Sequence, residues 1–137
     1  MIGAIIITHG DLGRELVTVA KCIVGQQQEI ETITLTPGES PGELKTKIEE
    51  TILKLDPDAG IIIFTDMFGG TPTNTSLPLT LNRKVELLTG VNLPMILEFF
   101  SSREVLPLAE LVQKIKQTGQ KTIINAKEMF LQKLKKV

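Results

Sequence analysis

Two polar segments of the chain hold the residue types best suited to chemistry. Thr8-His9-Gly10-Asp11 follows an apolar run that starts at Ile2, and Thr65-Asp66 follows another that starts at Gly60. A carboxylate that accepts a hydrogen bond from one ring nitrogen of a histidine fixes its tautomer and leaves the other nitrogen free as a nucleophile. If the two segments meet, His9 is a candidate nucleophile or phosphoryl carrier with Asp66 as its partner.

The residues after Asp66 suggest what such a site would hold. Gly69, Gly70 and Thr71 precede a predicted helix, and exposed backbone N–H groups of this kind suit an anion such as phosphate. Gly10 permits close approach of a bulky partner beside His9. Met67 and Phe68 have no strand pattern to bury them. They form either an apolar rim for a protein partner or a plug for the core.

Each feature has a plainer explanation when taken alone. A single histidine is often a surface or capping residue, an aspartate after a strand often caps a turn, and Gly-Gly is usually a turn. One histidine with scattered carboxylates gives no metal-ligand cluster. The chain lacks a Walker phosphate-binding motif and a serine in a G-x-S-x-G context. Cys22, the only cysteine, excludes an internal disulfide, and the helical pattern around it predicts a small core residue.

Composition and charge narrow the class of protein. The 137 residues include 42% hydrophobic residues and carry a net charge of -1, which indicates one globular domain without the basic surplus of nucleic-acid-binding proteins. No apolar run is long enough to span a membrane, and the first residues lack the features of a signal peptide, so we expect a cytoplasmic protein. Residues 1–111 hold 8 basic and 15 acidic residues, whereas residues 112–137 hold 7 basic and 1 acidic. The basic end is either a solvated helix or a segment that docks on an acidic surface, such as a second subunit.

Strand-like and helix-like segments alternate along the chain. Strands are predicted at five short apolar runs: 2–8, 30–35, 60–65, 85–88 and 122–124. The first and third are continuous rather than alternating, as in strands buried on both faces, whereas the second alternates and belongs nearer an edge. This order predicts a doubly wound α/β fold with a mostly parallel sheet of four to five strands and helices on both faces. Sites in such folds lie at the carboxyl ends of the strands, where His9 and Asp66 are expected.

The helices between the strands have readable ends and faces. The first is expected to turn Leu12, Leu16, Val19, Ala20 and Ile23 inward and to stop at Gly25. Ser40-Pro41-Gly42-Glu43 is typical of a capping box, and Asn92-Leu93-Pro94 of another helix start. Pro78 is expected to kink or end the third helix early. A helix ending near Gly119 and a final one over 126–136 complete the pattern.

Three segments together resemble the mannose-family enzyme IIA of the bacterial phosphoenolpyruvate:sugar phosphotransferase system. They are Thr8-His9-Gly10, the stretch from Thr65 to Pro72, and Gly90-Val91-Asn92-Leu93-Pro94-Met95. The likeness covers about residues 1–125 in the same order. The resemblance implies a doubly wound domain whose last strand is exchanged across a homodimer.

The resemblance also implies a function. His9 would accept a phosphoryl group from phosphorylated HPr and pass it to enzyme IIB, as a phosphotransferase that needs no cofactor besides the phosphoryl group itself. Asp66 falls on the family's aspartate that hydrogen-bonds the histidine. Thr71 falls on a small hydroxyl residue, often serine, that helps to hold the phosphoryl group.

Alternatives from other classes stay open at this point. With no enzyme IIB domain expected after it, the single domain over 1–137 would serve a transporter or signal through its phosphorylation state. The related phosphodonor subunit of dihydroxyacetone kinase has a similar fold and a different acceptor. A receiver domain phosphorylated on Asp66 would need neighbouring acids after the first strand to hold Mg²⁺, and Thr8-His9-Gly10-Asp11 does not offer them. A small-ligand-binding domain without chemistry is the last candidate.

Overall fold

Among the residues that the structure describes, the sheet has four strands that all run parallel. The computed structural model describes residues 1–82 and 84–136. Its strands are β1 (Gly3–His9), β2 (Ile30–Leu35), β3 (Ile61–Thr65) and β4 (Val85–Leu88). Their order is β2-β1-β3-β4, so β1 and β3 are the inner strands and β2 lies at an edge, as its alternating pattern predicts.

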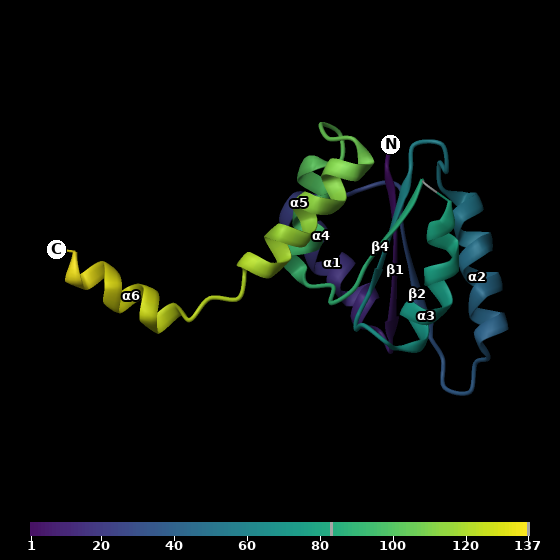
Figure 1. The fold of residues 1–137 in the computed structure, drawn as a ribbon, viewed down its shortest axis with the longest axis horizontal. Helices are drawn as coiled ribbons and strands as arrows, with labels where there is room; N and C mark the ends of the chain where they lie inside the picture. The colour runs from purple at the N-terminus through teal and green to yellow at the C-terminus, as the bar shows by residue number, and fades with distance from the viewer. Residues whose placement is uncertain (83, 137) are drawn as a thin grey trace.

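Helices cover both faces of this sheet (Figure 1). They are α1 (Leu12–Val24), α2 (Pro41–Lys54), α3 (Thr71–Ser76), α4 (Leu93–Ser102), α5 (Leu108–Lys121) and α6 (Ala126–Lys135), with a 3₁₀ turn η1 (Leu77–Leu81) after α3. Figure 1 shows α1, α4 and α5 on one side and α2 and α3 on the other. The doubly wound α/β architecture predicted from the order of segments is therefore confirmed.

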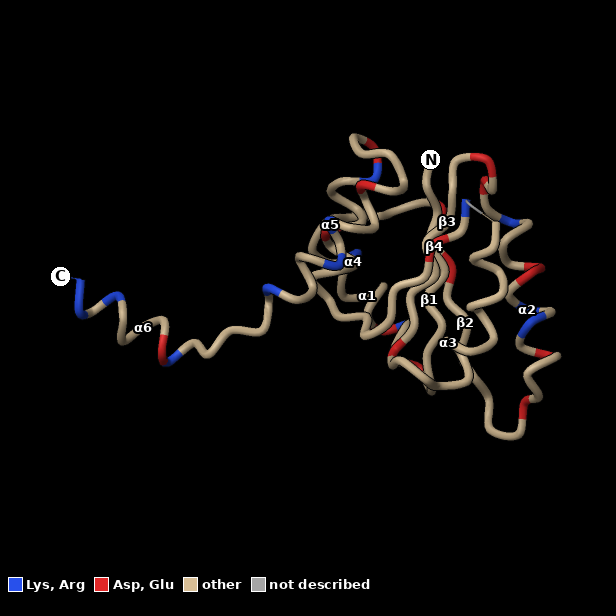
Figure 2. Tube along the Cα trace, in the orientation of Figure 1, with Lys and Arg blue, Asp and Glu red and all other residues tan. Residues whose placement is uncertain are grey.

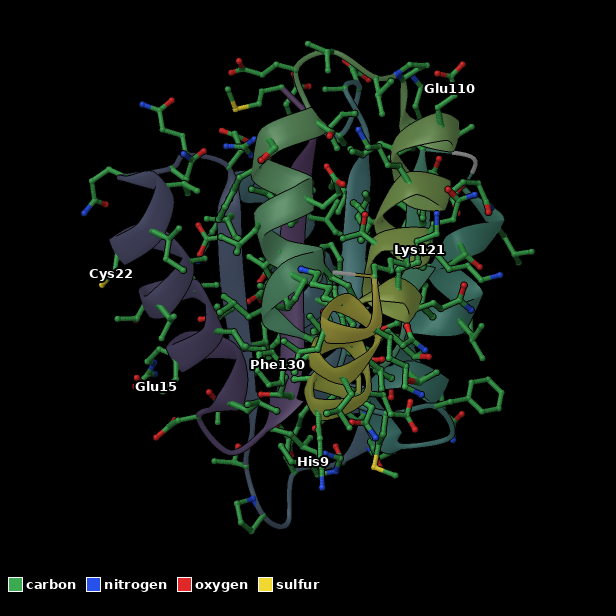
Figure 3. The ribbon with its side chains drawn as sticks, turned by 90° about the vertical axis from the view of Figure 1, so that its left-hand side faces the viewer. His9, Glu15, Cys22, Glu110, Lys121 and Phe130 are labelled. Carbon is green, nitrogen blue, oxygen red and sulfur yellow. The ribbon has the colours of Figure 1, made fainter. Side chains whose placement is uncertain are left out.

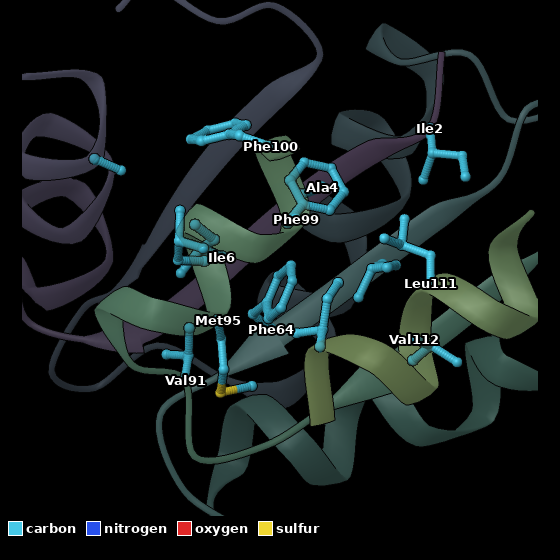
Figure 4. Close-up of a cluster of buried hydrophobic side chains, with 14 of the residues drawn as sticks. Ile2, Ala4, Ile6, Phe64, Val91, Met95, Phe99, Phe100, Leu111 and Val112 are labelled. Atoms are coloured by element: carbon cyan, nitrogen blue, oxygen red, sulfur yellow. The ribbon is translucent and has the colours of Figure 1, made fainter. Parts of the chain in front are cut away.

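The two inner strands are anchored by side chains buried on both faces. Because successive side chains of a strand point to opposite faces, each isoleucine run supplies two cores. On one face Ile6 and Phe64 pack under α4, where the Phe64 ring meets the Phe99 ring edge-on with centroids 5.9 Å apart (Figure 4). The other face holds the alternate residues Ile5, Ile7, Ile61 and Ile63. Burial of each such side chain contributes about 1.5–3 kcal/mol, which fixes the strand ends that carry the site.

Helix ends follow the predicted caps. Ser40 Oγ accepts a hydrogen bond from the N–H of Glu43 at 3.1 Å at the start of α2, and Asn92 Oδ1 accepts one from the N–H of Met95 at 3.1 Å at the start of α4. Helix α1 ends before Gly25, whose φ of 87° favours glycine. Helix α3 ends two residues before Pro78 and continues as η1, in agreement with the early end predicted there.

The predicted inner face of α1 is confirmed for Ala20 and for Leu16, which packs against the core, and is wrong for the other three residues. The helix buries Gly13, Val17 and Ala20, and leaves Leu12, Val19 and Ile23 48%, 43% and 58% exposed. Small residues set this face because the helix lies close to β1: a Cβ on Gly13 would stand 3.0 Å from Ile6 Cγ2. Cys22, predicted as a core residue, is exposed on the outer side of α1 (Figure 3).

The C-terminal part differs most from the expectation. Helix α5 begins at Leu108 and runs past Gly119 to Lys121. Gly119 lets the helix pack closely on α4, since a Cβ there would come within 2.7 Å of Met95 Cγ. The predicted fifth strand at 122–124 is wrong for the described residues: Thr122 still has a helical backbone at the end of α5, the next residues form an irregular linker, and α6 projects from the body beyond it (Figure 1). A strand needs a partner edge to form its ladder, and this segment lies away from the sheet.

A buried arginine ties together the sheet end opposite the predicted site. Arg103, 4% exposed, donates hydrogen bonds to the carbonyl oxygens of Ile2 at 3.2 Å and Gln28 at 2.8 Å. Its guanidinium also lies over the Phe99 ring, 5.0 Å from the centroid. Burial lowers the pKa of this guanidinium below its usual value, although the nearby acidic Glu104 and Glu29 oppose that shift. Arg103 thereby joins the end of α4 to the segments that lead into β1 and β2.

Candidate functional site

His9 is the last residue of β1, so it lies at the carboxyl edge of the sheet, and its side chain projects outward from that edge (Figure 3). Its side chain is 52% exposed, so a partner molecule can reach the ring. Strand β1 lies directly beside β3, with Ile7 opposite Thr65 in the register. This pairing brings the residues that follow the two strands to the same edge.

Asp66 follows β3 and binds His9 at two points. Its Oδ2 accepts a hydrogen bond from the His9 backbone N–H at 2.9 Å and from the ring Nδ1 at 2.8 Å. A carboxylate can only accept, so Nδ1 carries the proton and the lone pair of the neutral ring resides on Nε2. The carboxyl is partly buried, which acts to raise its pKa, but the hydrogen bonds and charge of His9 outweigh burial and hold the pKa of Asp66 below its usual value.

The turn after β1 holds the histidine from the other side. Thr8 is buried, and its Oγ1 accepts a hydrogen bond from the Gly13 N–H at 2.8 Å, which ties the strand end to the first turn of α1. Gly10 adopts a φ of 57°, a conformation that L residues adopt rarely. Apart from its two chain neighbours, no atom of the described residues lies within 4 Å of the position of a Cβ on Gly10, so the space beside it is open.

Of the predicted phosphate-binding glycines, Gly70 approaches the histidine ring across the loop after β3. A Cβ on Gly70 would stand 3.5 Å from His9 Cε1 and 3.3 Å from Met67 Cγ. Cε1 lies between the two ring nitrogens, so Gly70 borders the edge of the imidazole that carries both Nδ1 and Nε2. Gly69, with a φ of 84°, precedes it in the loop, and Thr71 opens α3 directly after it.

Met67 and Phe68 lie on the surface of the loop between β3 and α3. Their exposed fractions are 54% and 79%, which rules out the alternative that they plug the core. Phe68 also borders a groove of about 700 Å³ along β4, between η1 and α5. The groove is lined in part by Leu77, Leu88 and Val112.

Two buried threonines behind this loop were not singled out by the sequence. Thr65 Oγ1 and Thr73 Oγ1 lie 2.7 Å apart, and Thr73 Oγ1 donates to the Met67 carbonyl at 2.7 Å. Both side chains are completely buried. In the sequence, Thr65 is only a threonine at the end of an isoleucine-rich strand, and Thr73 is only a threonine shortly after Gly-Gly. Without the path of the loop between them, this pattern does not predict that their hydroxyl groups meet.

Other ligand classes find less support in the part of the chain that the structure describes. Among residues 1–82 and 84–136, no three His, Cys, Asp or Glu side chains gather closely enough to hold a metal ion. None of the helices described has both the length and the apolar character needed to cross a membrane. The buried polar side-chain atom without a hydrogen-bond partner in this part is Asp66 Oδ1, which belongs to the site.

Comparison with known proteins identifies relatives along nearly the whole chain. A family model described as "PTS system fructose IIA component" matches residues 3–116. The mannose-specific EIIAB component of Escherichia coli K12 is 31% identical over 124 residues, which cover 89% of this chain and 38% of that protein. The fructose-specific EIIA component of Bacillus subtilis 168 is 29% identical over 123 residues, which cover 89% of this chain and 84% of that protein.

The fold of this chain is also similar to that of a solved EIIA structure. The crystal structure of the phosphotransferase system component EIIA from Streptococcus agalactiae aligns with a TM-score of 0.85 and 26% identity, covering 93% of this chain and 99% of that one. The chain spans well under half the length of the E. coli mannose-specific component. The resemblance found in the sequence is confirmed, and the chain belongs to the fructose- and mannose-type EIIA family of the phosphotransferase system.

Proposed function

We propose that this protein is a cytoplasmic phosphoryl carrier that accepts a phosphoryl group from phosphorylated HPr on His9 and passes it to an enzyme IIB. The observation that carries the proposal is the pair of hydrogen bonds from His9 to Asp66 Oδ2, at 2.9 and 2.8 Å. They hold the proton on Nδ1 and leave Nε2 of a half-exposed ring free for attack.

The proposed transfer step is balanced without a cofactor. The Nε2 lone pair of His9 forms a bond to phosphorus while the bond from phosphorus to the donor nitrogen of HPr breaks, and that electron pair stays on the donor ring. The His9 ring then carries positive charge, since both nitrogens are substituted, and Asp66 Oδ2 beside Nδ1 offsets it. The acceptor of enzyme IIB then attacks the phosphorus, the bond from Nε2 to phosphorus breaks, and its electron pair returns to the His9 ring. Placement in line with the leaving nitrogen supplies most of the rate.

The loop beside the ring supplies the surroundings of the phosphoryl group. Gly70 has no side chain to fill the space beside Cε1, and a phosphoryl group on Nε2 would lie next to it. The backbone of Gly69 and Gly70, the hydroxyl or N–H of Thr71 and the open space at Gly10 are assigned to its binding. These assignments rest on proximity and on the anion preference of backbone N–H groups.

The exposed residues of this loop form the proposed partner surface. Met67 and Phe68 present apolar side chains directly after Asp66, on the edge of the sheet where His9 is accessible. Exposed aromatic and methionine side chains of this kind are enriched at protein interfaces. We assign them to contact with HPr and enzyme IIB, which must both reach the same ring.

A homodimer completes the proposal. Within the described residues β4 pairs only with β3, so its outer edge is free, and the groove beside it is lined by apolar side chains. The segment before α6 carries Ile123, 88% exposed, and Ile124, 53% exposed. Figure 2 shows the lysines of the projecting α6, which match the acidic surplus of the rest of the chain. Exchange of this segment between two copies would pair the free edge and bury the isoleucines.

The proposed carrier role is tested by reconstitution. Incubation with phosphoenolpyruvate, enzyme I and HPr should add one acid-labile, base-stable phosphate per chain, and His9→Ala should take up none. Because His9 is the single histidine, a labelled His9→Ala protein would contradict the proposal. Addition of an enzyme IIB should then discharge the label, whereas discharge only by a dihydroxyacetone kinase subunit would assign the alternative acceptor.

A further inference from the structure

We infer that Thr73 is a positioning residue for His9: its buried hydroxyl, which accepts from Thr65, donates to the Met67 carbonyl and so holds the loop that carries Asp66 against the first turn of α3. The inference rests on the proposed function, since it concerns how His9 is held for transfer. Thr65 and Thr73 are both fully buried and lie on either side of the exposed loop that carries Asp66 and Met67.

The direction of the hydroxyl chain follows from donor and acceptor counting. The Met67 carbonyl can only accept, so the single hydroxyl hydrogen of Thr73 is used at 2.7 Å on that oxygen. Thr73 has no second hydrogen, and therefore Thr65 must donate to Thr73 across their 2.7 Å contact. The chain runs from Thr65 to Thr73 to the Met67 carbonyl.

This chain fixes the backbone on both sides of Asp66. Thr65 precedes Asp66 and is also held through its carbonyl oxygen, which accepts from the Val91 N–H at 3.0 Å. Met67 follows Asp66 and is held by Thr73. A second tether, from Asn74 Nδ2 to the Gly69 carbonyl at 3.2 Å, is exposed and holds a later point of the loop. The buried tether at Met67 is therefore the one that sets where the Asp66 carboxylate meets His9.

The two hydroxyl groups make different demands on the structure. Thr73→Val leaves the Thr65 hydroxyl buried without a partner, which is costly, and it removes the donor to the Met67 carbonyl. Thr65→Val removes a donor but leaves the bond from Thr73 to Met67 intact. The double variant Thr65→Val/Thr73→Val no longer has an unpaired Thr65 hydroxyl, but its Met67 carbonyl still lacks the hydrogen bond from residue 73. Stability and phosphoryl transfer should therefore respond differently across these three variants.

The experiment measures melting temperature, the rate of labelling by phosphorylated HPr, and the ¹⁵N spectrum of the His9 ring at a pH where it is neutral. Thr73→Val should lower the melting temperature by about 5–10 °C. It should also slow labelling about tenfold to a hundredfold and mix the two ring tautomers, because a misplaced carboxylate no longer selects Nδ1–H. Thr65→Val should label nearly as the unmodified protein does. Thr65→Val/Thr73→Val should regain part of the melting temperature but not the rate.

Matched controls separate positioning from general loss of stability. Thr73→Ser retains the donor and should restore both rate and ring spectrum. Thr51→Val removes another buried hydroxyl, which donates to the Lys47 carbonyl within α2, and should not slow labelling. If Thr73→Val fails to fold, the double variant provides the same rate and tautomer test.

Three results would overturn the inference: an unchanged rate and ring spectrum in Thr73→Val, recovery of the rate along with stability in the double variant, or slowed labelling in Thr51→Val. Failure of the proposed function would look different. In that case the unmodified protein would take up no phosphate on His9, while the tautomer spectra of the same variants would still support or refute the positioning by Thr73.

Discussion

A single oxygen of Asp66 holds both the backbone and the ring of His9. Oδ2 accepts hydrogen bonds from the His9 backbone N–H at 2.9 Å and from the ring Nδ1 at 2.8 Å. The carboxylate therefore fixes both the backbone position of His9 and the orientation of its ring. The other oxygen, Oδ1, is buried and has no partner among the described residues. Both hydrogen bonds of the carboxylate to His9 therefore go through Oδ2.

Asp66→Asn should slow labelling of His9 by about one to three orders of magnitude while the fold stays intact. Asparagine keeps the shape, but it loses the negative charge and can present its NH₂ group to Nδ1 in place of an acceptor. Rate and melting temperature should be measured together. Asp11→Asn is the matched control, because Asp11 is exposed on the neighbouring turn and pairs only loosely with Arg14, at 3.9 Å.

The competing explanation is that Asp66 merely caps the turn before the glycines. It predicts the opposite pattern for Asp66→Asn, with a lowered melting temperature and a normal labelling rate. That pattern would remove Asp66 from the proposed transfer machinery and leave the assignment of His9 standing.

Gly70→Ala should slow labelling about tenfold or more without a loss of stability. The φ of Gly70 is -79°, which alanine adopts readily, and the contacts of a Cβ at 3.5 Å from His9 Cε1 and 3.3 Å from the flexible Met67 side chain are tolerable. The methyl group would instead occupy space that a phosphoryl group on Nε2 requires. Gly42→Ala, which meets only Ser40 Oγ at 3.9 Å, is the control. A Gly70→Ala protein that labels at the normal rate would show that the phosphoryl group lies elsewhere.

The sequence predicted the parts of this structure that depend on local pattern. The isoleucine runs of β1 and β3 identify buried parallel strands, and the rule that sites lie at the carboxyl edge brings His9 to Asp66. Contacts between distant residues could not be predicted in this way: Arg103 reaches the carbonyl of Ile2, 101 positions away. The buried face of α1 depends on how closely Gly13 approaches β1, and the pairing of Thr65 with Thr73 depends on the path of the loop between them.

The C-terminal segment could not be predicted for a different physical reason. Ile123 and Ile124 have the composition of a strand, but a strand also needs an edge to pair with, and a single copy of the chain offers this segment none in the described structure. Local propensity alone does not make a strand, and in the described structure these residues belong to none.

Glu98→Gln should destabilise the protein at neutral pH by about 1–2 kcal/mol without affecting labelling. Glu98 joins α4 to α5, because Oε2 accepts from Ser102 Oγ at 2.6 Å and Oε1 from Thr118 Oγ1 at 2.8 Å. Glutamine has one acceptor oxygen, so one hydroxyl group would face its NH₂. Denaturant unfolding of both proteins measures the difference.

The effect of Glu98 should also depend on pH. The hydrogen bond from Ser102 holds the pKa of Glu98 below its usual value; burial opposes this, and Thr118 and Lys114 add to it. A lowered pKa contributes stability above the unfolded pKa of about 4.3, and this stability is lost as the pH falls through the folded value. The gap between the unmodified protein and Glu98→Gln should therefore shrink in acid. Glu104→Gln, at an exposed position, should show little difference at either pH, and a gap that persists in acid would contradict the charge-based explanation.

The exposed segment before α6 should join two copies of the chain. Light scattering at micromolar concentration should give about twice the 15.1 kDa of one chain, because Ile124 and its neighbour would pair with the free edge of β4 in the partner. Ile124→Asp places a charge in that apolar contact and should yield monomers. Ile23→Asp is a matched control, since Ile23 is 58% exposed on α1 and Ile124 is 53% exposed. A mass near 15.1 kDa for the unmodified protein would contradict the dimer, and a dimer broken by Ile23→Asp but not by Ile124→Asp would place the interface on α1 instead.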